Sequence, residues 1–512
     1  MKPFRFLALL LALGMTARAS NNILLIIADD YGIDSSSLYN TVPPAASLPP
    51  TPTIASLAQT GLRFTHAYAS PVCSPTRASM LTGRHAFRTG VGTVVSPTSG
   101  DNQLKATEFT LPRAFAAYGA LGYSVAAFGK WHLATGALSP GSVGGWPYFE
   151  GSIPGALQSY TNWNKVITNG VTSNSTTITN YATTELVDNV RTWIQGRGTQ
   201  PWFAWVAFNA GHTPLHTPPT NLHSYGPTPG TQRRQYEAMI EAMDTEIARL
   251  LLVVDRSKTD IIFLGDNGTI GSLIQPPFPT GRGKDTLYEG ALRVPLIVNG
   301  PSVVSPGRTS DTPVQVMDLF STILELAGIN VAATVPAGTT IDARSLKPII
   351  QNLSDTRTEW YAEEFDALAP TTGGRVLRDD RYKLIRNRSG TDEFYDLQTD
   401  AYESTNLFAG GVSAMTAVQQ SYYYRLRFHL GRYTTAATPP VSSSGLGAGS
   451  FTVTVLQSAA ATQTLWRCTD LPGSFWAPAP SATSSVSGGN LTFTDSAPPS
   501  GTAFYSVIAE TP

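Results

Sequence analysis

Two short acidic motifs carry oxygen ligands that suit a hard metal ion. Asp29 and Asp30 end the segment NNILLIIADDYG, and Asp266 and Asn267 lie at the end of DIIFLGDNG. Clustered carboxylates repel one another unless a cation lies among them. Such ligands favour Ca²⁺, or Mg²⁺, over zinc, which prefers His and Cys. Either motif alone is a common turn sequence, so the prediction of a metal site depends on the two coming together.

Two lysines and two histidines add positive charge and proton-transfer groups. Lys130 and His132 lie in GKWHL, His212 in GHTP, and Lys284 in the glycine-rich segment GRGK. Beside a metal, lysines would neutralise the oxygens of an anionic substrate, and histidines would exchange protons near neutral pH. This set predicts hydrolysis of a phosphate or a sulfate ester, and residue types alone leave the choice between them open.

Cys73, one of only two cysteines, lies in the segment VCSPTRASMLTG. We expect a polar loop here, in which a cysteine close to Arg77 is a candidate for chemistry. The alternatives are a small buried hydrophobe or a disulfide with Cys468, which secretion would permit.

The elements that must position these residues read as alternating strands and helices. Four apolar runs end in the polar residues above, at 21–32, 123–133, 201–214 and 260–268. Such runs are typical of strands buried on both faces of a parallel sheet. Amphipathic segments at 51–64, 236–254 and 313–328 predict helices between them. The fold class is therefore α/β, and the carboxyl ends of its strands form the expected ligand site.

Composition divides the chain into five expected parts. Residues 1–19 have a basic start, a short apolar stretch and an A-x-A-like end, which predicts a signal peptide and a secreted or periplasmic protein. The remaining parts are an α/β catalytic domain, a smaller α+β subdomain, a Pro/Ser/Gly-rich linker and a small all-β module of unknown role, at 20–354, 355–433, 434–449 and 450–512. The net charge of −1 argues against a nucleic-acid partner, and no segment is long and apolar enough to predict a membrane span.

The segment CSPTRASMLTG resembles the signature of the type I, formylglycine-dependent sulfatases, C-x-P-x-R followed by an apolar residue and T-G. IADDYG, GKWHL, GHTPLHTPP, LGDNG and GKDTLYEGALRVPLIV are similar to further motifs of that family, in the same order. RYKLIR and FYDLQTDAYESTNL look like its C-terminal subdomain. The resemblance runs from about residue 21 to about residue 432. It implies an arylsulfatase-like enzyme of the alkaline phosphatase superfamily, with a large mixed, mostly parallel sheet between helices and a smaller antiparallel C-terminal sheet.

The resemblance also implies a role for each matching residue. A maturation enzyme would oxidise Cys73 to Cα-formylglycine, whose hydrated aldehyde attacks sulfur and is regenerated when sulfate leaves. Arg77 would stabilise the formylglycine. The metal, usually calcium, would be held by Asp29, Asp30, Asp266, Asn267 and the modified residue 73. Sulfate oxygens would be bound by Lys130 and Lys284, and protons handled by His132 and His212.

Several alternatives stay open at this point. Phosphodiesterases and phosphonate hydrolases of the same superfamily share a similar metal edge, and a catalytically inactive glycan-binding relative is a further class. Sulfated carbohydrate is the expected substrate. His216 could line the substrate pocket or be an ordinary loop residue. The tryptophans at 131, 146 and 163 could stack on sugar rings or simply pack in the interior.

Overall fold

One large mixed sheet forms the centre of the molecule. The computed structural model describes residues 21–42, 48–366, 368–369, 372–433, 441–447, 450–457, 462–468, 477–487, 489–499 and 503–510. The sheet has 11 strands in the order β10-β2-β9-β8-β1-β7-β3-β4-β5-β6, and β11 also pairs with β2. The strands are β1 (Asn22–Ala28), β2 (Leu62–Tyr68), β3 (Ser124–Lys130), β4 (Tyr148–Ser152), β5 (Trp163–Asn169), β6 (Thr172–Ile178), β7 (Trp202–Ala207), β8 (Thr259–Gly265), β9 (Arg293–Asn299), β10 (Arg308–Ser310) and β11 (Val314–Gln315).

The four apolar runs predicted as strands are neighbours at the centre of this sheet. β8, β1, β7, β3 and β4 lie side by side and are parallel. β9 is antiparallel to β2 and β8, and β5 is antiparallel to β4 and β6. Successive side chains of β1 alternate between two cores, with Ile23, Leu25 and Ile27 on one side and Leu24 and Ile26 on the other. A strand buried on both faces therefore reads as a continuous apolar run, and the α/β prediction is confirmed.

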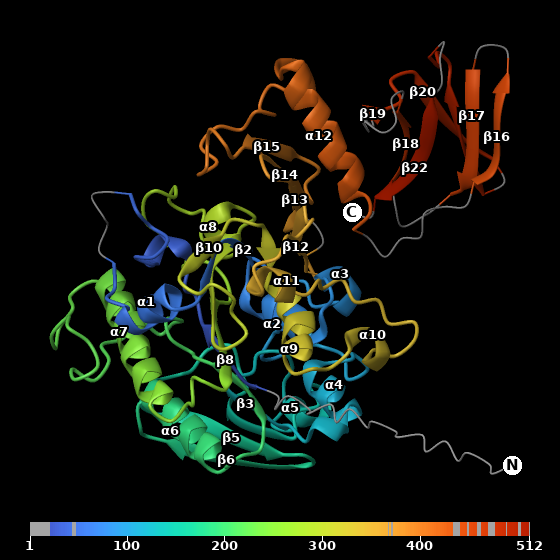
Figure 1. Ribbon diagram of the computed structural model, residues 1–512. Helices are drawn as coiled ribbons and strands as arrows, with labels where there is room; N and C mark the ends of the chain where they lie inside the picture. Colours follow the sequence, from blue (N-terminus) through green and yellow to red (C-terminus); the bar gives the residue numbers. More distant parts are fainter. Residues whose placement is uncertain are drawn as a thin grey trace, which may run out of the picture.

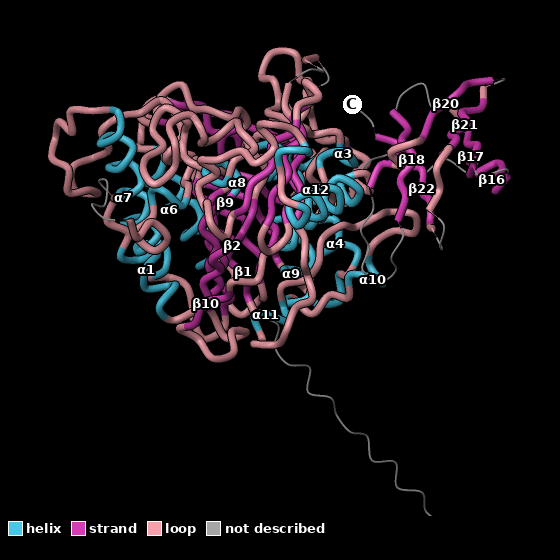
Figure 2. Tube along the Cα trace, turned by 90° about the horizontal axis from the view of Figure 1, so that it is seen from above, coloured by secondary structure: helices cyan, strands magenta, loops and turns pink. Residues whose placement is uncertain are grey.

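Helices cover both faces of the sheet (Figures 1 and 2). One face packs against α1 (Pro52–Gln59), α6 (Ala182–Gln195) and α7 (Gln232–Leu251), and the other against α2 (Cys73–Thr82), α4 (Leu111–Ala117) and α9 (Leu319–Leu326). The Thr231 hydroxyl caps α7 by accepting the N–H of Arg234 at 3.2 Å. Single-turn helices are α3 (Ala86–Thr89), α5 (Ser139–Ser142), α8 (Glu289–Leu292), α10 (Val331–Thr334) and α11 (Lys347–Ile350). Short 3₁₀ turns are η1 (Ile33–Ser35), η2 (Gly119–Leu121), η3 (Val316–Asp318) and η4 (Val412–Ala414).

A second, antiparallel sheet follows the large one along the chain. It has the order β12-β13-β14-β15, with β12 (Trp360–Glu364), β13 (Gly374–Arg378), β14 (Tyr382–Asn387) and β15 (Asp392–Asp396). One face packs against helix α12 (Ala417–Leu430) through Tyr423 and Leu426. The other packs against the large domain, where Trp360 stacks on Tyr68 with ring centroids 3.8 Å apart. The smaller sheet is thus fixed to the end of β2 rather than loosely attached.

The last part of the chain contains two short facing sheets. Their orders are β16-β17-β21-β20 and β19-β18-β22. The strands are β16 (Val441–Gly447), β17 (Ser450–Leu456), β18 (Thr462–Cys468), β19 (Ala477–Pro478), β20 (Ala482–Ser487), β21 (Asn490–Asp495) and β22 (Phe504–Glu510). The module rests on α12, where buried Trp466 meets the rings of Tyr424 and Phe428. Figure 1 shows it beside α12, at the end of the molecule away from α6 and α7.

Two expectations from composition need comment. The range 434–449, expected to be a linker, contains strand β16, because the backbone of that Ser/Gly-rich segment pairs with β17. The expected signal peptide, residues 1–19, lies outside the described residues and stays a prediction. Among the described helices, none is both long enough and apolar enough to cross a membrane.

Candidate active site

The predicted metal ligands lie together at the carboxyl ends of two neighbouring strands. Asp29 and Asp30 follow β1, and Asp266 and Asn267 follow β8, to which β1 is paired. The strand ladder continues one step further, since the Asp266 N–H donates to the carbonyl of Ala28 at 3.0 Å. All four side chains are buried, and the amide of Asn267 donates to Asp30 Oδ1 at 2.8 Å. The sheet thereby converts two ordinary turn sequences into one cluster.

Cys73 lies inside this cluster, but not in a polar loop. It is the first residue of α2, and its exposed fraction is 0%. The expectation of a loop was wrong: CSPTRASMLT has few apolar residues, yet all of its residues are buried in a helix. The helix ends at Gly83, which lies in the left-handed region at φ 70°. The Cys73 thiol is free, so the alternative of a disulfide with Cys468 was wrong.

The two predicted lysines flank Cys73. Lys130 Nζ lies 3.3 Å from Cys73 Sγ and donates to Asp29 Oδ2 at 2.6 Å. Lys284 Nζ lies 3.4 Å from the same sulfur and donates to Asp30 Oδ1 at 2.6 Å. Each lysine thus bridges the position of residue 73 and one carboxylate, although the two come from segments over 150 residues apart.

Arg77, one helical turn after Cys73, fixes the opposite side of the cluster. Its Nε and one terminal nitrogen both donate to Asp266 Oδ2, at 3.0 and 2.7 Å, and its other nitrogen donates to the carbonyl of Lys130 at 3.1 Å. The guanidinium is completely buried. A planar fork of donors suits this arrangement better than a single ammonium would.

The cluster has the donor set of a cation site. One ligand atom from each of Asp29, Asp30, Cys73 and Asp266 lies within 4.8 Å of all the others. Asp30 Oδ2 and Asn267 Oδ1 are buried and have no hydrogen-bond partner among the described residues. Buried oxygens without partners are costly, and oxygen donors in this number suit calcium or magnesium. The residues therefore fit the metal that the sequence predicts.

Burial and neighbouring charges shift the pKa values of the carboxyls and the thiol in this cluster. Burial raises the pKa of Asp266, and the Asp29 carboxylate raises it further despite Arg77. Burial also acts to raise the pKa of Asp29, but Lys130, His212 and Arg77 together hold it well below its usual value. Burial raises the pKa of the Cys73 thiol to about 12. An unmodified Cys73 is therefore protonated at neutral pH, and only a thiolate is a good sulfur nucleophile.

His132 is held neutral beside the lysines. Burial, followed by the charges of Lys130 and Arg77, lowers the pKa of His132 well below its usual value. Its Nδ1 has no hydrogen-bond partner among the described residues, and its carbonyl accepts the Ser74 hydroxyl at 2.8 Å. Gly155 lies flat against the ring, because a Cβ there would come within 2.3 Å of it. A neutral imidazole of this kind can accept a proton.

His212 faces the cluster from the loop after β7. Its Nδ1 lies 3.0 Å from the carbonyl of Thr213, which assigns the proton of a neutral ring to Nδ1 and directs Nε2 toward Asp30 Oδ2 at 4.0 Å. The Tyr160 hydroxyl donates to the carbonyl of His212 at 2.9 Å. The His216 ring packs against Tyr160 at a tilt of 33°, with centroids 4.2 Å apart. The structure thus places His216 beside the ring that holds His212, and its role as a substrate ligand stays a prediction.

A buried hydroxyl joins the two metal loops to each other, and sequence reasoning missed it. Thr269 Oγ1 donates to Asp34 Oδ1 at 2.6 Å, lies 2.9 Å from Ser35 Oγ and accepts the N–H of Gly32 at 3.3 Å. The carbonyl of Thr269 also accepts the N–H of Lys284 at 2.9 Å. Thr269 therefore connects the loop after β8, the loop after β1 and the lysine loop. The only signal in the sequence is its position two residues after Asn267.

The tryptophans considered for sugar stacking do not reach a surface. Trp131, Trp146 and Trp163 are all buried, with exposed fractions of 4%, 1% and 7%. Trp146, for example, packs edge-on against Trp205 of β7. The packing alternative is confirmed for all three, and the stacking interpretation was wrong.

Comparisons with known proteins agree with this geometry. The Sulfatase family model matches residues 21–329, and a model described as N-sulphoglucosamine sulphohydrolase, C-terminal, matches residues 283–428. The chain is 28% identical to arylsulfatase J of Mus musculus over 332 residues, which are 61% of this chain and 54% of that protein. It is 28% identical to N-acetylgalactosamine-6-sulfatase of Canis lupus familiaris over 412 residues, 73% of this chain and 74% of that protein.

Solved structures share the fold. The PsFucS1 sulfatase from Pseudoalteromonas sp. superposes with a TM-score of 0.64 at 20% identity, covering 82% of this chain and 92% of that one. Ps i-CgsB in complex with k-i-k-neocarrahexaose superposes with a TM-score of 0.64 at 23% identity, covering 76% and 89%. The first family model spans more than half of the chain, including every residue of the cluster. The chain therefore belongs to the sulfatase family and is a sulfuric ester hydrolase.

Proposed function

We propose that the protein hydrolyses sulfate esters of carbohydrates and releases inorganic sulfate, with Cys73 converted to formylglycine and a divalent metal bound beside it. The observation that carries this proposal is the position of Lys130 and Lys284, whose ammonium groups both lie within 3.4 Å of the residue 73 side chain. An anion bound there would meet two positive charges in a buried site, where electrostatic stabilisation is strongest.

Calcium, or magnesium, would be held by Asp29, Asp30, Asp266, Asn267 and residue 73. The metal supplies Lewis acidity when bound, and the hydrated aldehyde of formylglycine supplies the nucleophile. The remaining chemistry belongs to the side chains around them. Arg77 holds Asp266 by two donors and so fixes one side of the ligand cluster.

The lysines bind and orient the sulfate group. Lys130 and Lys284 approach residue 73 from two different segments, so an anion between them has its oxygens fixed relative to the reacting atom. Both ammonium groups are also anchored to carboxylates. The Lys130 side chain is completely buried, whereas that of Lys284 is partly exposed. The substrate therefore enters the site from the side of Lys284.

The two histidines divide the proton transfers. His132 is neutral and buried, which suits acceptance of a proton from residue 73. His212 is partly exposed, and its Nε2 faces the cluster, so the doubly protonated ring would deliver its Nε2 proton to the departing alcohol oxygen and keep the Nδ1 proton on the Thr213 carbonyl. Tyr160 and the Thr213 carbonyl hold the His212 loop and ring in this orientation.

The carbohydrate part of the proposal is supported by the relatives. One similar protein is named N-acetylgalactosamine-6-sulfatase, and one similar structure is described as a complex with its substrate D-glucosamine-2-N,6-O-disulfate. We extend this substrate class to the present chain, and a panel of sulfated oligosaccharides would identify the sugar and the sulfated position.

The test measures conversion and turnover on the same protein. Mass spectrometry of the peptide that carries residue 73 should show the aldehyde when the chain is made in a host with a maturation enzyme, and that protein should release sulfate from an aryl sulfate and from sulfated oligosaccharides. Cys73→Ala should abolish release, whereas Cys468→Ala, which removes the other cysteine, should not. Sulfate release by Cys73→Ala at the unmodified rate would overturn the proposal.

A further inference from the structure

A cavity of about 490 Å³ lies between the lysine loop and the second sheet. This volume is within the range of small-ligand sites. Its lining comes from the lysine loop, the ends of β12 and β14, the residues before β13, β15 and the loop after α3.

The cavity is directly connected to the reacting centre by the chain. Asp285, in its wall, follows Lys284, whose ammonium faces Cys73. The N–H of Asp285 donates to the carbonyl of Pro71 at 3.1 Å, two residues before Cys73. Asp285 has φ 73°, in the left-handed region, so the backbone turns sharply between the two side chains. Consecutive residues therefore serve the sulfate site and the cavity.

The lining is polar and acidic. Four of its side chains are carboxyls, at 285, 364, 366 and 393, three are threonines and one is asparagine, and no described lining residue is lysine or arginine. The Glu364 carboxyl shares a hydrogen bond with Asp285. Burial, together with Asp285, raises the pKa of Glu364 to about 8, so the pair retains a proton at neutral pH. Because that proton is used between the two carboxyls, the pair presents acceptor oxygens, to which the hydroxyls of a sugar can donate.

The aromatic part of the wall is held rigidly. The Tyr288 hydroxyl donates to Glu393 at 2.9 Å, and the Arg282 guanidinium lies over the Tyr288 ring, 4.2 Å from its centroid. Phe365 lies against Gly92, where a Cβ would come within 2.4 Å of the ring. Arg282 covers one face of Tyr288, and Leu287, Phe365 and Ile385 add further apolar surface to the wall. Apolar surface beside hydroxyl-binding groups suits a sugar ring, which presents both C–H and O–H groups.

We propose that this cavity binds an uncharged, hydroxyl-bearing sugar ring of the substrate and disfavours a ring that carries a uronate or a second sulfate. The inference rests on the proposed function and deepens it by naming the substrate class. Carboxylates accept hydrogen bonds from sugar hydroxyls, and the same carboxylates repel a second anion in a partly buried site. The lysines remain reserved for the one sulfate group beside residue 73.

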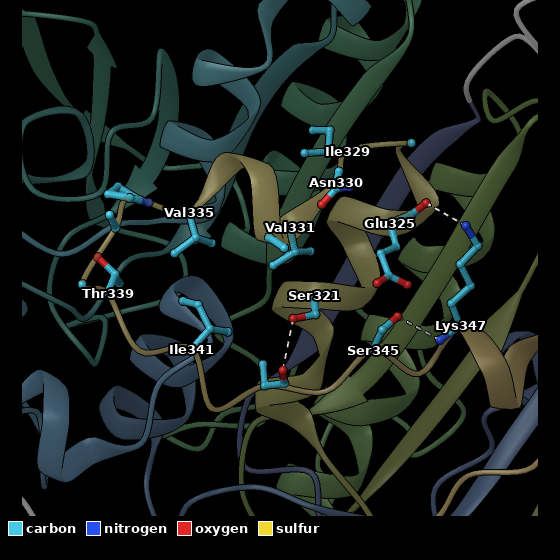
Figure 3. A pocket seen from close by; sticks show the side chains of 16 residues that line it. Ser321, Glu325, Ile329, Asn330, Val331, Val335, Thr339, Ile341, Ser345 and Lys347 are labelled. Atoms are coloured by element: carbon cyan, nitrogen blue, oxygen red, sulfur yellow. Dashed lines mark hydrogen bonds between the residues drawn. The ribbon is translucent and has the colours of Figure 1, made fainter.

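A larger cavity of about 820 Å³ provides the matched control. It lies between α9 and α10 and the loop that follows them, and Figure 3 shows Glu325, Lys347 and Ile341 in its wall. None of its lining residues belongs to a segment that carries a proposed catalytic group. Glu325 is therefore a carboxylate in a cavity wall with no link to Lys284.

The experiment compares Glu364→Ala with Glu325→Ala on three substrates: an aryl sulfate, a neutral monosulfated disaccharide, and its counterpart in which the second ring is a uronate. For the unmodified protein we expect kcat/KM to favour the neutral disaccharide about tenfold. Glu364→Ala should raise KM for the neutral disaccharide about tenfold, the effect of one lost hydrogen bond of about 1.4 kcal/mol. KM for the aryl sulfate should stay within about twofold, and Glu325→Ala should change neither.

A binding measurement keeps the inference separate from turnover. Saturation-transfer NMR with the sulfate-free neutral disaccharide should show contact with the unmodified protein and a weaker signal with Glu364→Ala. Absence of binding to the unmodified protein, an equal loss on aryl sulfate, or a preference for the uronate disaccharide would overturn the inference. Failure of converted protein to cleave the aryl sulfate would instead count against the proposed function.

Discussion

The hydroxyl of Thr269 is predicted to control the metal site without touching the metal. Thr269→Val keeps the shape of the side chain but removes the donor to Asp34 Oδ1, the contact with Ser35 Oγ and the acceptor for the Gly32 N–H. These groups are buried. At about 1 kcal/mol net for each hydrogen bond, plus a penalty for the buried groups left unpaired, the free energy of unfolding should fall by about 2–4 kcal/mol.

The matched control is Thr322→Val in α9. Thr322 Oγ1 donates to the carbonyl of Asp318 at 2.7 Å and accepts the N–H of Leu346 at 2.8 Å, and the side chain is also fully buried. Its loss should lower the free energy of unfolding by about 1–3 kcal/mol. Both variants should therefore be destabilised, but only Thr269→Val loosens the loops after β1 and β8 relative to each other.

The assay combines urea denaturation with calcium titration. We expect Thr269→Val to weaken apparent calcium affinity about tenfold or more, a loss of about 1.4 kcal/mol transmitted to the ligands, while Thr322→Val leaves it unchanged. Isothermal titration of the chelator-treated proteins gives the affinity, and turnover against calcium concentration gives an independent value. If both variants bind calcium equally well, the idea that Thr269 positions the ligand loops is wrong.

Three further predictions concern charge. Arg77→Lys should lower kcat on an aryl sulfate about a hundredfold, because one ammonium cannot replace two donors to Asp266 and one to the Lys130 carbonyl; near-normal kcat in protein with unchanged circular dichroism would refute this. Removing the metal with a chelator should lower the melting temperature and stop turnover, with recovery on adding calcium; unaltered melting would contradict the metal assignment. Burial raises the pKa of Glu363 to about 7. Between the ordinary pKa of a glutamate and pH 7, the folded protein therefore keeps a proton on Glu363 that the unfolded chain has released. As the pH rises to about 7, this group should lower the free energy of unfolding by about 3 kcal/mol. Glu363→Gln, which can still accept the Phe87 N–H, should show a flatter pH dependence in urea denaturation, and identical slopes would exclude the effect.

The sequence predicted the central strands and the polar residues at their ends because burial on both faces leaves a simple pattern. The runs of β1 and β8 are apolar without interruption, and the residues directly after these parallel strands must lie at the same edge of the sheet. Position along the chain was then enough to bring Asp29 near Asp266. The resemblance to a family added specific roles for Cys73, Arg77 and Lys284, which the residue types alone did not supply.

Other features depend on partners far away in the chain. The segment CSPTRASMLT looks like a polar loop because it is rich in serine and threonine. In the fold these hydroxyls donate to backbone carbonyls, as Ser74 does to that of His132, and a hydropathy pattern does not reveal such bonds. The sequence of β16 looks like a linker because it is rich in serine and glycine, and the strand forms only through its pairing with β17. The acidic cavity could not be predicted either, because its walls come from segments near residues 93, 285, 364 and 393.

The complete burial of Cys73 limits the time during which another enzyme could reach this residue to the period before the chain has folded. The pocket around this residue closes only when β8 has paired with β1, and the roughly 190 residues between Cys73 and the end of β8 take on the order of 10–40 s to translate. An enzyme that oxidises Cys73 must reach it while the chain is still open. If Cys73 is converted as proposed, fast folding would be a disadvantage for this chain, and a protein that folded before the conversion would remain inactive however stable it is.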